Sequence, residues 1–233
     1  NRTMERAEWF PLGEILGEVK ERLSSKPDYI TLGGSGEPTL YSRLGDLIEG
    51  IRAMTDIPAA VLTNGSLLWD RDIRRQVAGA NLVVPSLDAG DDAMFRKVNR
   101  PHPDISFELM VEGLADFRRE YRGGLWLEVF ILGGLTSLRD EAMKIAALAG
   151  KIAPDRVQLN TVTRPPAEDS AVAVSADALR DVARLFEPEA EIIAEYRTTS
   201  AGDDFIVARE AVLDTIRRRP CSVEDIAGGL GIH

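Results

Sequence analysis

A glycine-rich loop that ends in a carboxylate is the first stretch with residue types suited to ligand binding. The loop Gly33-Gly-Ser-Gly-Glu37 follows a short, mostly apolar run over 29–32. Glycines let a ligand approach bare peptide groups. The loop lacks the lysine of a phosphate-binding P-loop, and Thr39 stands where the dinucleotide fingerprint needs its third glycine. Because a carboxylate repels phosphate, the loop favours an amino-bearing ligand, and a plain strand-to-helix turn is the alternative.

Further polar side chains stand at or near the ends of later segments that have the pattern of strands. They are Asn64, Ser86, Asp88, Glu128 and Asn160. In a parallel sheet the carboxyl ends of the strands lie at one edge, where ligands bind in open sheets and in barrels alike. The recurrence of polar groups at this edge predicts a site for a small polar ligand.

Strand-like and helix-like segments alternate along the chain and would position these side chains. Short runs rich in β-branched and apolar residues predict strands over 29–32, 59–63, 81–88, 125–131, 156–161 and 191–194. Apolar residues at helical spacing predict helices over 12–23, 44–51, 70–78, 91–99, 107–121, 138–151 and 176–186. Such alternation is typical of right-handed βαβ units, so we expect an α/β fold with a parallel sheet, open or rolled into a barrel.

Composition narrows the class of protein. The 233 residues carry a net charge of −10 and one cysteine, Cys221, so a disulfide within the chain is excluded. No apolar run reaches the length of a membrane span and no secretory signal opens the chain, so we expect a cytoplasmic protein without a membrane partner. The acidic balance argues against a broad nucleic-acid surface. Because the chain begins at Asn1 rather than methionine, we expect a fragment.

Six short motifs in order resemble radical S-adenosylmethionine (SAM) enzymes, in particular the archaeal wyosine-type tRNA synthetases and their bacterial relatives. The similarity covers about 9–194. The motifs are Ser35-Gly-Glu-Pro38, Leu62-Thr-Asn-Gly65, Pro85-Ser-Leu-Asp88, Asn99-Arg-Pro-His-Pro103, Leu127-Glu-Val129, and Val157-Gln-Leu-Asn-Thr161 with Arg164-Pro-Pro166. The resemblance implies a partial (β/α)6 barrel over 1–196 without the first strand of the family, followed by a helical tail over 197–233.

The resemblance also implies a role for each polar strand end in binding SAM. Ser35, Gly36 and Glu37 would meet the amino group of the cofactor. Ser86 and Asp88 would contact the ribose, because one carboxylate can accept from both hydroxyls of a diol. Asn64 and Glu128 fall at positions of polar contacts to the cofactor carboxylate or ribose, and Asn160 at the adenine. Two alternatives stay open: Asp88 could cap the helix that begins near 91, and Arg164 could clamp an anionic group of the substrate.

One family motif is absent from the chain. Radical SAM enzymes bind a [4Fe–4S] cluster through Cys-x-x-x-Cys-x-x-Cys, and this sequence has only Cys221. We expect the motif upstream of Asn1, so that the chain alone is inactive; a relative that has lost its cluster is the alternative. In the intact family the reduced cluster cleaves SAM to a 5′-deoxyadenosyl radical that abstracts hydrogen. A flavodoxin or ferredoxin supplies the electron, and a tRNA base is one substrate that the resemblance allows.

The tail and two isolated residues complete the expectations. Ser222 with Asp225 forms a helix-capping pattern, and the tail resembles the first helices of a winged helix-turn-helix, although a helical cap on the barrel fits as well. A DNA-binding tail would make the chain a ligand-sensing transcriptional regulator, which is the alternative to an enzyme.

Arg74 is expected on a solvated helix face. His102, between two prolines, is expected in a rigid loop with a solvated imidazole, the alternative being a place in the site.

Overall fold

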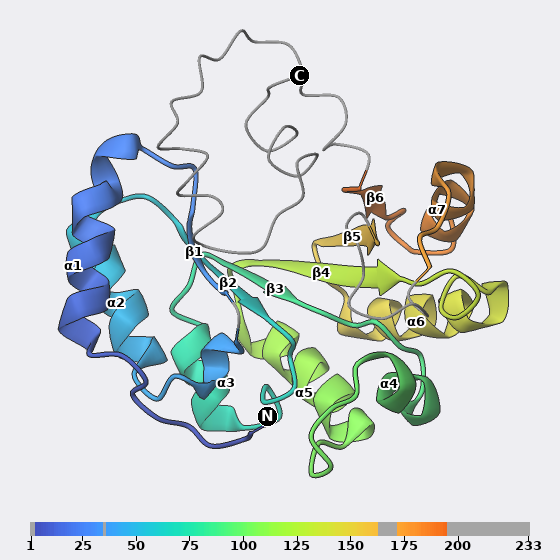
Figure 1. Cartoon of the computed structure of the whole chain (residues 1–233), viewed down its shortest axis with the longest axis horizontal. Coiled ribbons are helices and arrows are strands. Elements are labelled where there is room, and N and C mark those ends of the chain that lie inside the picture. Colours follow the sequence, from blue (N-terminus) through green and yellow to red (C-terminus); the bar gives the residue numbers. More distant parts are fainter. Residues whose placement is uncertain (1–2, 35, 163–171, 195–233) are drawn as a thin grey trace, which may run out of the picture.

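The computed structural model describes residues 3–34, 36–162 and 172–194 (Figure 1). Six strands form one parallel sheet in the order β1-β2-β3-β4-β5-β6. Their bounds are β1 Ile30–Leu32, β2 Ala59–Thr63, β3 Leu82–Pro85, β4 Gly124–Ile131, β5 Arg156–Thr161 and β6 Glu191–Ile192. The strand predictions are confirmed. The strand shortened most is β3, which ends at Pro85; proline has no N–H to donate to a neighbouring strand, and beyond it Ser86 pairs with Glu128 only as an isolated bridge.

Helices precede the first strand and connect the later strands, as the apolar spacing predicts. They are α1 Leu12–Arg22, α2 Leu44–Met54, α3 Arg71–Val77, α4 Asp92–Val98, α5 Phe107–Glu120, α6 Arg139–Ile152 and α7 Ala176–Ala183, with short 3-10 turns η1 Leu23–Ser25 and η2 Pro38–Leu40. Because each strand lies beside its successor in sequence, right-handed crossovers place the helices on the same side of the sheet. Figure 1 shows them along that side, from α1 and α2 at the β1 end to α7 at the β6 end.

The two faces of the sheet differ in burial, and β4 shows the difference most clearly. Leu125, Leu127, Val129 and Ile131 are fully buried and pack into the main core with the helices. The alternate residues Trp126, Glu128 and Phe130 are only partly buried and point to the opposite face. We call this opposite side the inner face; it carries Leu62, Val84, Ser86, Trp126, Glu128, Phe130, Gln158 and Asn160. The strictly sequential parallel sheet, with helices outside and polar groups inside, matches the predicted barrel-type α/β fold.

The prediction for Arg74 is wrong. Its side chain is buried and donates two hydrogen bonds to the Glu120 carboxylate, at 3.0 and 3.1 Å. It also donates to the carbonyls of Leu68 and Trp69, at 3.0 and 2.9 Å. Arg74 therefore fixes the loop between β2 and α3 against α5, and this loop begins with the candidate residue Asn64. Helical periodicity could not reveal the role, because the partner Glu120 lies 46 residues away.

Candidate functional site

Glu37 links the carboxyl ends of β1 and β2. Its Oε1 accepts hydrogen bonds from Thr39 N at 3.1 Å, Thr39 Oγ1 at 2.7 Å and Thr63 Oγ1 at 2.5 Å. Its Oε2 accepts from Asn64 N at 2.7 Å. A carboxylate has about four acceptor positions, two on each oxygen, so only Oε2 has room for one further donor. Glu37 is thus chiefly a structural tie, with one acceptor position left for a ligand.

Asn64 follows β2, and its side chain is held by a hydrogen bond within the turn that Asn64 begins. Its Oδ1 accepts from Ser66 N at 2.9 Å, and Gly65 between them has φ 72°, a conformation that favours glycine. Because the Ser66 N–H must meet an acceptor, the amide oxygen is placed there and Nδ2 points the other way. Among the described residues Nδ2 has no hydrogen-bond partner, so Asn64 offers a directed donor.

A row of polar side chains crosses the inner face at one level. Ser86 N donates to Thr63 O at 3.0 Å, which places Ser86 beside Asn64. Ser86 pairs with Glu128, and Glu128 pairs with Gln158 on β5. The structure therefore brings the predicted residues Asn64, Ser86 and Glu128 together in what we call the polar row. Gln158 completes the row and was not predicted; its position two residues before Asn160, on the same side of a strand, was the available signal.

Asp88 lies beyond the polar row and joins three segments. Its Oδ1 accepts from Phe130 N at 2.9 Å, and its Oδ2 accepts from Asn99 Nδ2 at 2.6 Å. Burial raises the pKa of Asp88 to about 6; the two hydrogen bonds lower it in part, and the charge of Glu128 adds to the rise. The alternative that Asp88 caps a helix is wrong, because the N-cap of α4 is Asp91, whose Oδ1 accepts from Met94 N at 2.9 Å.

Asn160 uses its amide within the site. Its Nδ2 donates to Glu128 Oε1 at 3.2 Å, and its Oδ1 accepts from Thr161 N at 2.9 Å. The pair fixes the Glu128 side chain and leaves Oε2 of that carboxylate without a hydrogen-bond partner among the described residues. Asn160 therefore orients a neighbour, and any contact with a ligand would come from its remaining acceptor position or its backbone.

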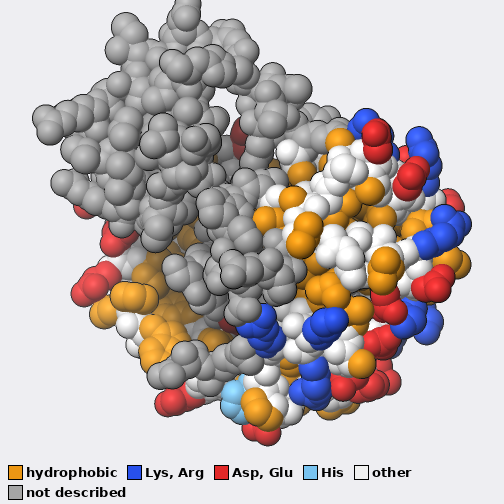
Figure 2. Space-filling model, turned by 45° about the vertical axis from the view of Figure 1, so that its right-hand side comes forward, with side chains coloured by type: hydrophobic (Ala, Val, Ile, Leu, Met, Phe, Trp, Pro, Cys, Tyr) orange, Lys and Arg blue, Asp and Glu red, His pale blue; other side chains and the backbone are white. Residues whose placement is uncertain are grey.

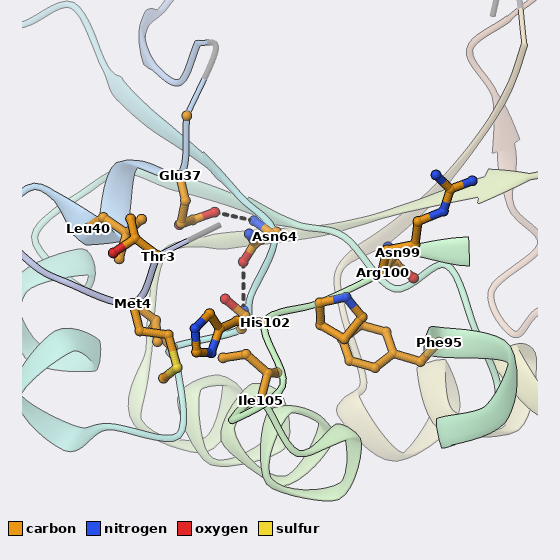
Figure 3. A pocket seen from close by; sticks show the side chains of 14 residues that line it. Thr3, Met4, Glu37, Leu40, Asn64, Phe95, Asn99, Arg100, His102 and Ile105 are labelled. Carbon is orange, nitrogen blue, oxygen red and sulfur yellow. Dashed lines mark hydrogen bonds between the residues drawn. The ribbon is translucent and has the colours of Figure 1, made fainter. Parts of the chain in front are cut away.

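A cavity of about 400 Å³ opens beside the polar row, between η2, the end of β2 and the segment 99–105 (Figure 3). We call it the side cavity. It is lined by Thr3, Met4, Gly36, Glu37, Leu40, Asn64, Ser66, Leu67, Phe95, Asn99, Arg100, Pro101, His102 and Ile105. Three predicted residues, Gly36, Glu37 and Asn64, belong to it, whereas Ser86, Asp88, Glu128 and Asn160 do not. His102 lines this wall with a partly exposed side chain, as the alternative of a place in the site allows.

Two predicted site residues lie outside the described part of the chain. They are Ser35 and Arg164, and the tail over 197–233 lies outside it as well. Among the described residues no group of three or more His, Cys, Asp or Glu side chains has the arrangement of a metal site. None of the helices in this part is long and apolar enough to cross a membrane.

Comparisons with known proteins agree with the architecture. A family model described as the Radical SAM superfamily matches residues 1–149. A "GTPase Obg" of Brachyspira hyodysenteriae is 38% identical over 226 residues, which are 95% of this chain and 33% of that protein. A UPF0026 protein of Methanocaldococcus jannaschii is 37% identical over 172 residues, 72% of this chain and 53% of that protein. The chain thus spans between a third and about half of these relatives.

A solved structure gives the same fold at low sequence identity. The radical SAM methyltransferase from Sphaerobacter thermophilus superposes with a TM-score of 0.59 at 15% identity, over 79% of this chain and 57% of that one. At this identity the likeness concerns the fold alone. The wyosine-type branch is not singled out by any of these matches.

Proposed function

The chain belongs to the radical SAM superfamily, and we propose that it binds S-adenosylmethionine across the carboxyl ends of its strands. The observation that carries the proposal is the polar row with Asp88 beside it. Among the described residues, Ser86 Oγ, Gln158 and Glu128 Oε2 have polar atoms without a protein partner, all on one face. Partly buried polar groups of this kind need a ligand or water, and a nucleoside with an amino-acid tail offers hydroxyl, amino and carboxylate groups along its length.

The ribose is assigned to Ser86 and Asp88. Each oxygen of the Asp88 carboxylate already accepts one hydrogen bond, from Phe130 N and from Asn99 Nδ2, so each has one position left for a diol hydroxyl. The amino end is assigned to Gly36 and Glu37 Oε2, the one open position of that carboxylate. Asn64 and Glu128 lie between these ends, and the resemblance places the adenine at Asn160. Ser35 would belong to the amino end, and Arg164 to the substrate.

The iron–sulfur cluster of the family does not fit the residues of this chain. The superfamily implies SAM and a [4Fe–4S] cluster, and the cluster is held by several cysteine thiolates. The chain has one cysteine, Cys221, outside the described residues. We therefore assign to this chain the binding and orientation of SAM and the exclusion of water from it. The cluster, with thiolates from outside this sequence, and an electron donor such as flavodoxin or ferredoxin would supply the radical chemistry.

The substrate is not named by the relatives. A tRNA base stays a prediction from the resemblance, and the net charge of −10 weighs against a phosphate-rich partner. Figure 2 shows basic and acidic side chains interspersed over the described part of one face of the molecule, rather than one continuous basic surface. The GTPase name of one relative is not adopted, since the sequence contains no Gly-Lys-Ser or Gly-Lys-Thr. The regulator alternative is less well supported than an enzyme, because the matched superfamily is one of catalysts.

The test is a calorimetric titration of the full chain with S-adenosylmethionine. Ser86→Ala removes a hydroxyl without a described protein partner, so the fold should be unchanged while the Kd for SAM rises roughly fivefold, the effect of one hydrogen bond worth about 1 kcal/mol. Ser25→Ala in η1, far along the chain from the site, should bind as the wild type does. Absence of saturable binding, or equal affinity of both variants and wild type, would remove the assignment.

A further inference from the structure

We propose that the side cavity binds a small organic carboxylate, with Ser66 and His102 as its polar ligands together with Asn64. The proposal rests on the proposed function in one respect, namely that this ligand would be the substrate positioned beside the bound cofactor. The binding site itself is argued from the cavity alone. It names a ligand class for residues, Ser66 and His102, that the SAM assignment does not use.

The polar groups of the side cavity are held so that donors remain for a ligand. His102 Nδ1 accepts from Asp104 N at 3.3 Å, which leaves the ring proton on Nε2 as a donor. Asn64 Oδ1 is bound to Ser66 N, which leaves Nδ2. The Ser66 hydroxyl has no partner among the described residues. Two donors fixed by neighbouring hydrogen bonds, together with the Ser66 hydroxyl, favour a ligand group with two acceptor oxygens, which a carboxylate provides.

The rest of the wall is apolar and suits the carbon part of such a ligand. Met4, Leu40, Leu67, Phe95 and Ile105 line the cavity. Its volume of about 400 Å³ lies within the range of roughly 300–1,000 Å³ that is usual for small-molecule sites. An inorganic anion would leave this apolar surface unused, and a hydrocarbon would leave the three donors unpaired. A carbon body that carries one carboxylate satisfies both halves of the wall.

The segment that carries His102 is built as a rigid wall. Arg100 has φ 47°, a left-handed conformation that is costly for a residue with a side chain. Pro101 and Pro103 restrict the backbone on either side of His102. The segment is tied at its start by the Asn99–Asp88 hydrogen bond and at its end by Arg96 Nη2, which donates to Ile105 O at 3.2 Å. A rigid wall reduces the ordering cost of binding.

The charges around the cavity determine which way the carboxylate points. In Figure 3, Asn64 lies between Glu37 on one side and His102 on the other, and Arg100 lies on the side away from Glu37. A carboxylate at Ser66 and His102 therefore lies on the side of Asn64 that faces away from the Glu37 charge. In this orientation the carbon part faces Met4, Leu40 and the proposed amino end of SAM.

Benzoate, a small aromatic carboxylate, serves as the probe, without SAM, in calorimetric and amide NMR titrations of the full chain. We expect saturable binding with shifts at Ser66 and His102. Benzyl alcohol and inorganic phosphate should each bind at least about tenfold more weakly. Ser66→Ala and His102→Phe should weaken benzoate about tenfold, equal to about 1.4 kcal/mol. Ser25→Ala should have no effect, and the melting temperatures of all three variants should match the wild type.

The outcomes separate this proposal from the SAM assignment. Both Ser66→Ala and His102→Phe should keep the wild-type affinity for SAM, because neither residue belongs to the proposed cofactor site. Benzoate binding without SAM binding would support the cavity and contradict the proposed function. SAM binding without saturable benzoate binding would overturn the cavity proposal alone. Equal benzoate affinity of wild type and both cavity variants, or equal binding of benzyl alcohol, would overturn it as well.

Discussion

Asp88 and Asn99 are joined by a hydrogen bond of 2.6 Å that connects the inner face of the sheet with the wall of the side cavity. The same carboxylate accepts from Phe130 N, so β4 is tied to the loop after β3 and to the segment after α4. One partly buried side chain thus holds together the two sites proposed above. A substitution at Asp88 should therefore affect both sites. It would change the charge at the proposed SAM site and the position of Asn99 in the wall of the side cavity.

The first prediction concerns the titration of Asp88. Its pKa in the folded chain is about 6, above the ordinary value of 3.8, so the folded state binds the proton more tightly than the unfolded state. Stability must then fall as pH rises from about 4 to about 6, and change no further through this group above that range. The free energy of unfolding of wild type relative to Asp88→Asn should therefore be more favourable at pH 4.5 than at pH 7. Carbon NMR of the carboxyl group should give the midpoint directly.

Asp91 is the matched control for that experiment. The hydrogen bond from Lys144 lowers the pKa of Asp91, with help from Met94 N. The stabilisation from Asp91 is present at neutral pH and lost as pH falls through its lowered pKa, so Asp91→Asn should show the opposite trend. If both variants change in the same direction with pH, burial is not the cause of the Asp88 shift.

The second prediction separates binding from stability at the same residue. Asp88→Asn keeps the shape of the side chain and removes the charged acceptor. Its Oδ1 can still accept from Phe130 N, and its Nδ2 can donate to Asn99 once the Asn99 amide turns over, so no donor is left facing a donor. We expect melting within a few degrees of wild type and affinity for SAM lower by about tenfold, or about 1.4 kcal/mol. Asp91→Asn should lower the melting temperature slightly and leave affinity unchanged, because it disturbs only the α4 cap and the pair with Lys144, neither of which belongs to the proposed site. Unchanged affinity in Asp88→Asn would mean that Asp88 is structural and that the ribose lies elsewhere.

The third prediction is that Glu37 contributes more to stability than to ligand binding. Glu37→Gln replaces one accepting oxygen by an NH₂ group that faces donors at Thr39, Thr63 or Asn64. We expect a loss of roughly 1.5–3 kcal/mol in the free energy of unfolding, measured by urea denaturation. Glu14→Gln, on the surface helix α1, should change stability by less than about 0.5 kcal/mol. Unchanged stability of Glu37→Gln would contradict its role as a tie.

The fourth prediction uses the neighbouring arginines of α3. Arg74→Ala leaves Glu120 without its partner and removes the donors of the Leu68 and Trp69 carbonyls. Loss of a buried pair costs about 3–5 kcal/mol, and because Glu120 is half-exposed we expect roughly 2–3. Arg75→Ala breaks only the exposed pair with Asp72 and should cost about 0–1 kcal/mol. Thermal or urea unfolding measures both variants. Similar losses of stability in the two would contradict the structural role assigned to Arg74.

The fifth prediction compares two helical glycines. A Cβ at Gly113 in α5 would lie 2.3 Å from Trp69 N, in contact with backbone that cannot yield cheaply. Gly113→Ala should therefore destabilise by about 1–3 kcal/mol or more through overpacking. Gly150 in α6 has open space around its Cβ position, so Gly150→Ala should stabilise by roughly 0.5–1 kcal/mol. Melting curves of the two variants should move in opposite directions.

Local patterns in the sequence were enough to predict the strands, the helices and the edge of the sheet where the candidate residues gather. Alternation along β4 and helical spacing along α5 are short-range properties, which a single segment displays by itself. The alternation of strands and helices along the chain then predicts a parallel sheet. In such a sheet Asn64, Ser86 and Glu128 lie at the same edge. Gln158 was within reach of the same argument, since it shares the side of β5 that carries Asn160.

Only the tertiary structure decided which polar atoms are already used. The Glu37 carboxylate is occupied by Thr39, Thr63 and Asn64, and Asp88 ties Phe130 to Asn99 although these residues are 31 positions apart in the chain. The burial of Arg74 beside Glu120 and the place of His102 in a cavity wall have the same origin. A hydrogen bond needs two groups within about 3 Å in the right direction, and that geometry is set by how distant segments pack rather than by the residues on either side of each group.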